Sequence, residues 1–518
     1  MNHCVTRAGL WAGFALVLLA PCAAQAADCT ELLKFSLPGA TPGQAVTIQK
    51  AEDVPAGTIA VSQGGPPLQV PMAAHCQVEG IIGAHTGRDG KSYGIRFALA
   101  LPEQWNGRLL YQGGGGLNGA VLPPVGGTAA GDIPALARGF AVVSSDSGHQ
   151  GAVFDASFMS DQQAALDFLY QDIGKVMTVA RPLVLARYAR PAAHSYFVGC
   201  STGGREAMIA AQRYPDQFDG IVVGSPAQRT NYSNLALRWV SASLNVAAPK
   251  DAQGHSQTQQ ALSSADRKLV VSALLQACDA LDGVRDGMIF DTRHCGFDPK
   301  VLQCKAGKNA SCLTAVQVHA IERAFGGPRG SSGRQVYPGF MYDTGIGFEG
   351  AGIPGLLSGG FTPEGPKQTS VEIDVDAESA VAHDGREMAG DTNAWTNLST
   401  FNGHGGKLIF FHGDSDPWFS ALDTVGYYER LASDNGPATV QDWSRLFLVP
   451  GMGHCGGGEA TLDHFDMLTA IVDWVEQGTA PERVIATGTA FPGRSRPLYW
   501  AWRGYGHSEK AENFSCKD

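Results

Sequence analysis

Six short apolar runs along the chain predict buried β-strands, each ending at glycine or polar residues. The stretch after the third run, residues 204–214, has the composition of a helix. Apolar strands that alternate with helical stretches indicate a parallel sheet covered on both faces. The sequence therefore predicts an α/β architecture. The six runs are residues 108–112, 139–144, 195–199, 220–224, 407–411 and 445–449.

The pattern changes between about residues 227 and 395, where strand signals fade. Glycine, proline and polar residues dominate this stretch, and four of the cysteines that follow residue 26 lie in it. We interpret residues 227–395 as a domain inserted at one end of the sheet. Residues 27–226 and 396–518 then form the domain that contains the sheet.

The first 26 residues resemble an export signal. A short basic start precedes an apolar run at residues 10–19, which is too short for the roughly 20 residues that span a bilayer. Cys22 raises the possibility of a lipoprotein, but Pro21 is a poor fit to a lipid-attachment signal. We expect cleavage after Ala26, and a secreted or periplasmic mature protein that is not anchored in a membrane.

The overall charge argues against two classes of partner. The formal net charge is -11, and no run is rich in lysine or arginine. Neither nucleic acid nor an anionic membrane surface is therefore an expected partner. The charge says little about small substrates.

The cysteine count favours disulfides. Removal of the signal leaves nine of the eleven cysteines, and disulfides are the default state in an oxidising compartment. The sequence alone does not give their connectivity, and the odd number leaves one thiol over. Cys516, two residues from the end, is the natural spare.

A candidate nucleophile follows the third apolar run. Residues 199–203 read Gly-Cys-Ser-Thr-Gly, a G-x-S-x-G motif placed after a strand and before a helix. Glycines on both sides allow the strained turn that projects Ser201 from the sheet. The helix start behind it offers backbone N–H groups to an oxyanion. The alternative is a tight glycine turn with an incidental serine.

A serine nucleophile needs a base, and the base needs an acid to orient it. In α/β-hydrolases the chain order is Ser, then Asp or Glu, then His. Asp416 follows the fifth apolar run and His454 follows the sixth. They therefore stand where the acid and the base of a triad with Ser201 belong.

Three nearby residues compete for these roles. Asp414 is the rival acid, but an Asp at this point is more typical of the turn itself. His412 is expected to be structural because it lies at a strand end. His464 is also expected to be structural, on a helix.

A run of four glycines, residues 113–116, follows the first apolar run. Glycine allows the backbone to approach a substrate closely. We expect this loop to supply one oxyanion donor, with Gly115 as the first choice, and Thr202 to supply the other. The alternative is a flexible surface loop.

Cysteines stand next to the predicted nucleophile and base. Cys200 precedes Ser201, and Cys455 follows His454. If the triad forms, their sulfur atoms come close together. A disulfide would tie the two loops together, whereas two buried free thiols are the alternative.

These motifs together resemble the tannase and feruloyl esterase family, which includes mono(2-hydroxyethyl) terephthalate hydrolases. The residues that carry the resemblance are segments 199–205, 412–417 and 451–455, and the likeness extends over nearly the whole mature chain. It implies an α/β-hydrolase core, a lid inserted between Ser201 and Asp416, and a Cys200–Cys455 disulfide.

The resemblance also implies a structural calcium ion in the lid. Residues 278–288 place three carboxylates and two glycines in a short segment, which suits a hard cation with oxygen ligands. The alternative is an acidic, solvated turn. By position, the ligands would be the side chains of Asp279, Asp282 and Asp286 and the carbonyls of Val284 and Met288.

Three further disulfides follow from the same resemblance: Cys278–Cys295, Cys304–Cys312 and Cys29–Cys76. The family often has another bridge near the C-terminus, but Cys516 has no partner left for it. No organic cofactor is expected.

Members of the resembling family prefer esters of aromatic acids such as ferulate, caffeate or gallate. Trp418 and Phe419 stand where the family has walls of the acyl pocket, although core packing would explain them equally well. Residues 337–342 are our prediction for lid residues over the pocket. The expected function is therefore hydrolysis of small aromatic esters by Ser201, His454 and Asp416.

Three alternatives remain open at this point. The terephthalate-monoester hydrolases use a lid arginine, and this chain has none between Arg334 and Arg386. A peptidase or lipase with the same triad is the second. A non-catalytic ligand-binding protein on the same scaffold is the third, but an intact Ser, Asp and His in the right order counts against it.

Overall fold

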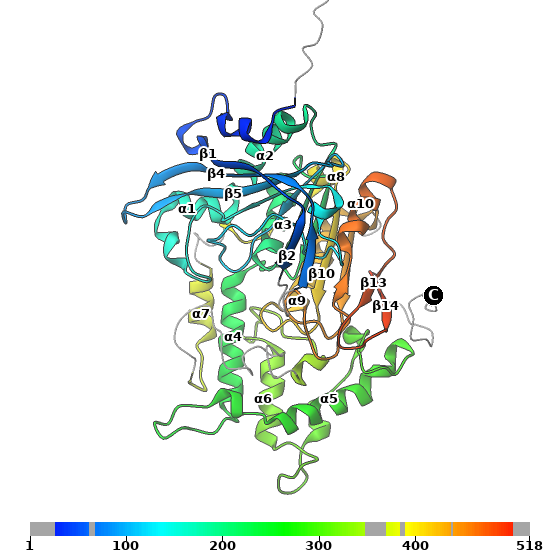
Figure 1. Cartoon of the computed structure of the whole chain (residues 1–518). Helices are drawn as coiled ribbons and strands as arrows, with labels where there is room; N and C mark the ends of the chain where they lie inside the picture. The colour runs from blue at the N-terminus through cyan, green and yellow to red at the C-terminus, as the bar shows by residue number, and fades with distance from the viewer. Residues whose placement is uncertain (1–25, 62–67, 348–368, 384–388, 437–438, 501–518) are drawn as a thin grey trace, which may run out of the picture.

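Figure 1 shows the fold, a computed structural model of the chain. The predicted signal peptide, apart from Ala26, lies outside the described residues, and so do Cys516 and Arg386. The structure describes residues 26–61, 68–347, 369–383, 389–436 and 439–500.

Nine strands form one large sheet, in the order β1-β4-β5-β7-β6-β8-β9-β10-β11. The six strands predicted from the apolar runs are β6 to β11, and they pair in parallel with one another. They are β6 (Arg108–Gln112), β7 (Ala141–Ser145), β8 (His194–Cys200), β9 (Gly220–Gly224), β10 (Lys407–Gly413) and β11 (Ser444–Val449).

The predicted parallel pairing holds for β6 to β11 but not at one edge of the sheet. Three further strands, β1 (Val46–Val54), β4 (His75–Thr86) and β5 (Ser92–Pro102), extend the sheet in antiparallel fashion. In β4, fully buried positions alternate with partly exposed ones along much of the strand. β1 and the start of β4 contain no continuous apolar run, whereas β5 contains one at residues 97–101 that is not among the six predicted strands.

Both faces of the sheet are covered by helices. Leu408 and Phe410 of β10 belong to a core cluster shared with α2 (Asp172–Tyr188), α3 (Thr202–Arg213) and α9 (Ala421–Asn435). Ile409 and Phe411 belong to a second cluster with α10 (Met467–Gln477) on the other face. The fold is thus the α/β-hydrolase type that the sequence predicts, on a mixed sheet.

The segment between β9 and β10 contributes no strand to the large sheet in its described part. We call residues 227–395 the inserted segment. It holds α4 (Thr230–Asn245), α5 (Ser264–Cys278), α6 (Ala315–Gly326) and α7 (Val375–Ala382), which gather at one end of the molecule in Figure 1. A third hydrophobic cluster joins α4, α5 and α6.

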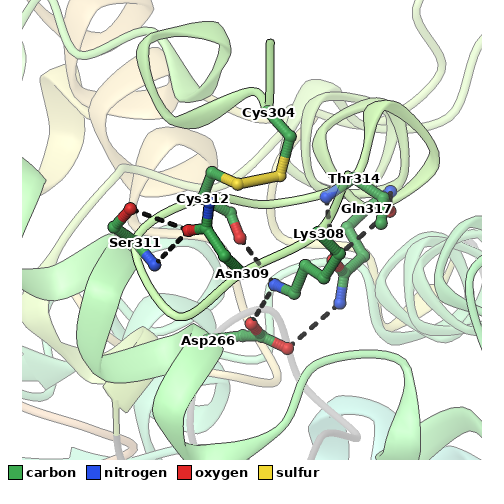
Figure 2. The surroundings of a disulfide bond; sticks show 8 residues. All are labelled: Asp266, Cys304, Lys308, Asn309, Ser311, Cys312, Thr314 and Gln317. Atoms are coloured by element: carbon green, nitrogen blue, oxygen red, sulfur yellow. Dashed lines mark hydrogen bonds and ion pairs between the residues drawn. A yellow bond between two sulfur atoms is a disulfide. The ribbon is translucent and has the colours of Figure 1, made fainter. Parts of the chain in front are cut away.

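Four disulfides join Cys29 with Cys76, Cys200 with Cys455, Cys278 with Cys295, and Cys304 with Cys312. These are the four pairs that the family resemblance implies. Figure 2 shows the Cys304–Cys312 loop, in which Lys308 donates to Asp266 and to the carbonyl of Cys312. Gln317, near the start of α6, donates to the same Asp266 near the start of α5, so this loop braces the two helices together.

The remaining elements are small. The short helices are α1 (Gln162–Leu166) and α8 (Ser399–Gly403), and the minor strands are β2 (Gly57–Val61), β3 (Leu68–Met72), β12 (His464–Phe465), β13 (Arg483–Thr487) and β14 (Ser495–Tyr499). Within the residues that the structure describes, no helix combines the length and apolarity needed to cross a bilayer.

Candidate active site

Ser201 lies in the turn between β8 and α3 with φ of 65° and ψ of −123°. Such a conformation costs a non-glycine residue about 1–3 kcal/mol. A Cβ on Gly199 would lie 2.3 Å from the carbonyl oxygen of Gly203, and one on Gly203 would lie 2.6 Å from that of Gly114. Only glycine therefore fits two residues before and two residues after the strained serine.

Asp416 and His454 meet at the ends of β10 and β11. Nδ1 of His454 lies 2.8 Å from Oδ2 of Asp416, whose other oxygen accepts the N–H groups of Trp418 at 2.9 Å and Phe419 at 3.1 Å. Burial alone would raise the pKa of Asp416, but His454 and His412 outweigh it and hold this pKa well below its usual range. The carboxylate therefore stays ionised beside the imidazole.

Ser201 and His454 line one cavity of about 390 Å³. Nε2 of His454 is buried and has no hydrogen-bond partner among the described residues. The other ring nitrogen is held by Asp416, so Nε2 is the nitrogen left for a serine hydroxyl. Catalytic hydrogen bonds commonly tighten only when substrate is bound.

The rival residues are placed elsewhere. Asp414 is buried and accepts from the Thr292 hydroxyl at 2.7 Å, and its own N–H donates to the carbonyl of Val449. His412 is fully buried, with its ring nitrogens near Thr424 and the carbonyl of Phe419, and Nε2 3.3 Å from Asp416. His412 is therefore structural, as expected, and its ring also contacts the predicted acid Asp416.

His464 does not lie on a helix as predicted. It lies in β12, and its Nε2 is 2.9 Å from a carboxylate oxygen of Asp132. The helix α10 begins only at Met467, since Asp466 caps it by accepting the N–H of Thr469. This cap moves the helix start three residues beyond the histidine.

Asp343, from the inserted segment, was not predicted to take part in the site. Its side chain is fully buried, and one carboxylate oxygen accepts from the Ser415 hydroxyl and from the N–H of Gly451, both at 2.7 Å. Ser415 precedes Asp416, and Gly451 lies in the loop that leads to His454. Asp343 therefore joins the acid loop to the base loop, a role for which its sequence neighbours give no signal.

The glycine loop packs against the start of α3. The N–H of Gly113 donates to the carbonyl of Val198 at 2.9 Å, and that of Gly114 donates to Glu206 at 2.9 Å. In the described residues, the N–H groups of Gly115 and Thr202 have no acceptor, and both residues line the cavity beside Ser201. The two expected oxyanion donors are thus brought to the same cavity.

The disulfide between Cys200 and Cys455 spans 255 residues of sequence. It connects the residue before Ser201 to the residue after His454. The nucleophile turn and the base loop are therefore joined covalently, one residue away from each side chain.

Trp418 and Phe419 also line the cavity. Their ring centroids lie 4.7 Å and 5.3 Å from that of His454. Other aromatic and aliphatic walls come from the sheet domain. They are Leu117, Leu122, Phe154, Phe158, Met159, Phe168 and Leu169.

The prediction that residues 337–342 cover the pocket is wrong. None of these residues lines the cavity in the described part of the chain, and Tyr337, Phe340 and Met341 are buried in the core. Large apolar side chains suit a packed core as well as a pocket, and here they serve the core. The inserted segment instead lines the cavity with residues 227–234, Leu237, Ala382, Gly390 and Asp391.

Arg229 is a cationic residue of the inserted segment that lines the cavity. Its Nε lies 3.1 Å and 3.2 Å from the two carboxylate oxygens of Asp423. Its guanidinium also lies over the Tyr337 ring, 5.0 Å from the ring centroid. The charge of Arg229 is therefore neutralised by the protein itself.

The segment implied to bind calcium forms a tight, acidic loop. Asp279, Asp282 and Asp286 are all buried, and burial together with the other two carboxylates raises the pKa of Asp282 to about 7. Arg496 pairs with the Asp286 carboxylate at 2.6 Å, and the guanidinium of Arg494 donates to the Asp286 carbonyl at 2.7 Å. The three carboxylates outnumber these two arginines, and the remaining negative charge would suit a bound cation.

The side chains alone do not form a ligand group in the described part of the chain, where no three His, Cys, Asp or Glu side chains are close enough to hold a metal ion. Asp279 accepts the N–H groups of Asp286 and Gly287, and Asp286 is turned toward Arg496. A cation here would need the Val284 and Met288 carbonyls as well as the carboxylates.

The comparison with known sequences agrees with these motifs. The sequence model of the family described as tannase and feruloyl esterase matches residues 76–352 and 369–517. The chain belongs to this family. It is therefore an ester hydrolase with the α/β-hydrolase fold.

Individual relatives of this esterase carry two kinds of name. Mono(2-hydroxyethyl) terephthalate hydrolase of Piscinibacter sakaiensis is 37% identical over 86% of this chain and 85% of its own length. Probable feruloyl esterase B-1 of Aspergillus fumigatus is 32% identical over 74% of each chain.

Solved structures extend the likeness to the fold. Feruloyl esterase B from Aspergillus oryzae superposes with a TM-score of 0.72 at 25% identity, over 91% of this chain and 97% of its own. Tannin acyl hydrolase from Aspergillus niger gives a TM-score of 0.69 at 22% identity, over 94% of each chain.

Proposed function

We propose that this esterase cleaves esters of aromatic acids, of the hydroxycinnamic or gallic type, with Ser201 as nucleophile. His454 takes the serine proton as Oγ attacks the ester carbonyl, and Asp416 holds the imidazole in the required tautomer. The N–H groups of Gly115 and Thr202 receive the oxyanion.

The reaction then completes in two steps. His454 returns its proton to the departing alcohol, which leaves an acyl group on Ser201. Water, deprotonated by His454, attacks this acyl-enzyme and releases the acid. The observation that supports the proposal best is the His454–Asp416 hydrogen bond at the cavity that Ser201 lines.

Substitution of the nucleophile tests this mechanism. Ser201→Ala is expected to lower kcat for p-nitrophenyl acetate at least 10³-fold, and a fluorophosphonate should label wild type but not the variant. Ser160→Ala, which removes an exposed hydroxyl, is the matched control and should behave as wild type. Activity of Ser201→Ala near that of wild type would contradict the assignment.

The aromatic walls of the cavity favour a planar acyl group. Trp418, Phe419 and the phenylalanines of the sheet domain offer faces on which an aromatic acid can stack. Trp418→Ala should raise KM for methyl ferulate about tenfold and change KM for p-nitrophenyl acetate less, because acetate has no ring to stack.

Hydrolysis of mono(2-hydroxyethyl) terephthalate is the second candidate, because the relative of that name is 37% identical. A free carboxylate on the substrate needs an available cation, and Arg229 is engaged by Asp423. Side-by-side rates with methyl ferulate, methyl gallate, chlorogenate and the terephthalate monoester distinguish the candidates. A higher kcat/KM for the terephthalate monoester would favour the second.

A calcium ion, held by Asp279, Asp282, Asp286 and the carbonyls of Val284 and Met288, is proposed to fix the inserted segment. When bound, it would neutralise the buried carboxylates. Removal with EGTA should lower Tm, and added calcium should restore it. Asp282→Asn should reduce bound calcium in a metal analysis, whereas unchanged stoichiometry would contradict the ligand set.

Two further proposals concern the whole chain. The inserted segment acts as a lid, which is supported by the cavity residues it supplies. Export is supported by the signal-like residues 1–26 and by four disulfides, which persist in oxidising compartments. Fractionation of expressing cells, with N-terminal sequencing of the exported form, tests cleavage after Ala26.

A further inference from the structure

Glu206 lies five residues after Ser201, on the helix α3 that follows the nucleophile. It is 2% exposed and does not line the cavity, so it cannot touch a substrate. Its carboxylate nevertheless receives two hydrogen bonds from the glycine loop. One comes from the N–H of Gly114 at 2.9 Å, and the other comes from the side-chain amide of Asn118.

These two donors stand on either side of Gly115. Gly114 precedes it directly, and Asn118 follows it by three residues and donates its own N–H to the Gly115 carbonyl at 2.9 Å. Asn118 has a φ of 55°, and a Cβ on Gly114 would lie 2.3 Å from the Asn118 side chain. The loop is thus folded tightly around a single buried carboxylate.

The same helix also holds the loop at other points. The N–H of Gly203 donates to the Gly114 carbonyl at 3.1 Å, and the hydroxyl of Thr202 donates to the Gly116 carbonyl. Since Ser201 directly precedes this helix, the helix supports both the nucleophile and the loop. Glu206 accepts the N–H of Gly114. The next N–H along the loop, that of Gly115, has no acceptor among the described residues and is free to bind the oxyanion.

We propose that Glu206 is a positioning residue that aims the Gly115 N–H at the oxyanion. The inference rests on the proposed serine mechanism. The negative charge of Glu206 would repel the developing oxyanion and not stabilise it. Glu206 therefore acts through the hydrogen bonds that it accepts. Loss of one oxyanion donor costs about 10²- to 10³-fold in kcat, which sets the size of the expected effect.

The acceptor role predicts which substitutions preserve function. In Glu206→Gln, the amide oxygen can accept from Gly114, and its NH₂ can donate to Asn118 once the Asn118 amide rotates. Asn118 can do so because its Oδ1 has no partner among the described residues. Glu206→Asp keeps the charge but is one methylene too short to reach both donors, and Glu206→Leu has no acceptor.

Steady-state kinetics on p-nitrophenyl acetate and methyl ferulate test the proposal. We expect Glu206→Leu and Glu206→Asp to lose about 10²-fold in kcat, with KM within twofold of wild type. Glu206→Gln should stay within about fivefold of wild type. Fluorophosphonate labelling of Ser201 should slow in parallel, because the phosphoryl oxygen occupies the same place as the oxyanion.

Asp172→Asn is the matched control. Asp172 is another buried acid near Glu206, but it accepts from Tyr111 and Ser145 and does not touch the loop. Its kcat should lie within twofold of wild type. Circular dichroism and Tm identify a variant that does not fold. If Glu206→Leu does not fold, the kinetics of Glu206→Asp test the proposal.

Two failures are distinguishable. Wild type that is not labelled at Ser201 would overturn the serine mechanism, and this inference with it. Normal labelling of wild type, combined with kcat of folded Glu206→Leu and Glu206→Asp within threefold of wild type, would overturn the role of Glu206 alone. A Glu206→Gln variant as slow as Glu206→Leu would likewise contradict the hydrogen-bonding role.

Discussion

The sheet domain and the inserted segment contribute to the site in different ways. The sheet domain supplies Ser201, Asp416 and His454 from turns directly after strands, so short stretches of backbone place each one. The inserted segment reaches the same site through polar side chains, such as the buried Asp343 and the partly exposed Arg229, whose partners lie far away in sequence. Local backbone structure thus positions the reacting residues, whereas tertiary contacts position the residues that support them.

Removing the acid from the sheet domain should have the largest effect. Asp416→Asn is expected to lower kcat about 10⁴-fold, because the wrong tautomer of His454 is then stabilised. Asp414→Asn should stay within about tenfold of wild type, because Asp414 faces Thr292. Measurement of kcat for the two folded variants shows which aspartate is the acid of the triad. Equal losses of kcat would contradict the assignment of Asp416.

Removing the bond between the two site loops should come next. The Cys200→Ser, Cys455→Ser variant is expected to lose about 10²-fold in kcat, since a misplacement of 1 Å costs that much. Loop-closure entropy suggests a stability loss of about 5 kcal/mol for its separation of 255 residues.

The Cys304→Ser, Cys312→Ser variant is the matched comparison within the inserted segment. Its separation of 8 residues predicts a stability loss of about 2.5 kcal/mol and an unchanged kcat. Denaturant unfolding and kinetics measure both quantities. A loss of kcat in this variant would show that the inserted segment transmits strain to the site.

A smaller effect is expected where the inserted segment supports the site. Asp343→Ala should lower kcat about tenfold, because the acid and base loops lose their shared acceptor. Ser415→Ala removes one of the two hydrogen bonds and should cost less. If Asp343→Ala retained the kcat of wild type, the sheet domain would be able to hold the two loops alone.

The smallest effect concerns specificity. Asp423→Asn removes the carboxylate that pairs with Arg229 beside the cavity, so KM for a terephthalate monoester should fall about fivefold. KM for the neutral dimethyl ester should change little. Equal changes for the two substrates would mean that Arg229 does not reach the acyl group.

The sequence was informative where local backbone rules apply. Ser201, Asp416 and His454 follow apolar runs, and a strand that is buried on both faces leaves a continuous apolar signature. The antiparallel strands β1 and β4 carry no such signature, whereas β5 carries one at residues 97–101 but is not among the six predicted strands. Tyr337, Phe340 and Met341 pack in the core and not at the pocket, since large apolar side chains suit packing and binding alike.

The residues that support the site could not be predicted from the sequence, for a physical reason. Asp343 contacts Ser415 and Gly451, and Glu206 contacts Gly114 and Asn118, across separations that no periodic pattern encodes. Glu206 lies three residues beyond the G-x-S-x-G motif, and a helical Glu is ordinarily solvated. Only its burial in the fold distinguishes it.

The Cys200–Cys455 disulfide also has a consequence for biogenesis. During synthesis the nucleophile turn emerges long before the base loop, and the whole inserted segment is made in between. The bond can close only after residue 455 has left the ribosome and has met an oxidant. This covalent step therefore takes place one residue from the nucleophile and only after almost the whole chain has been made.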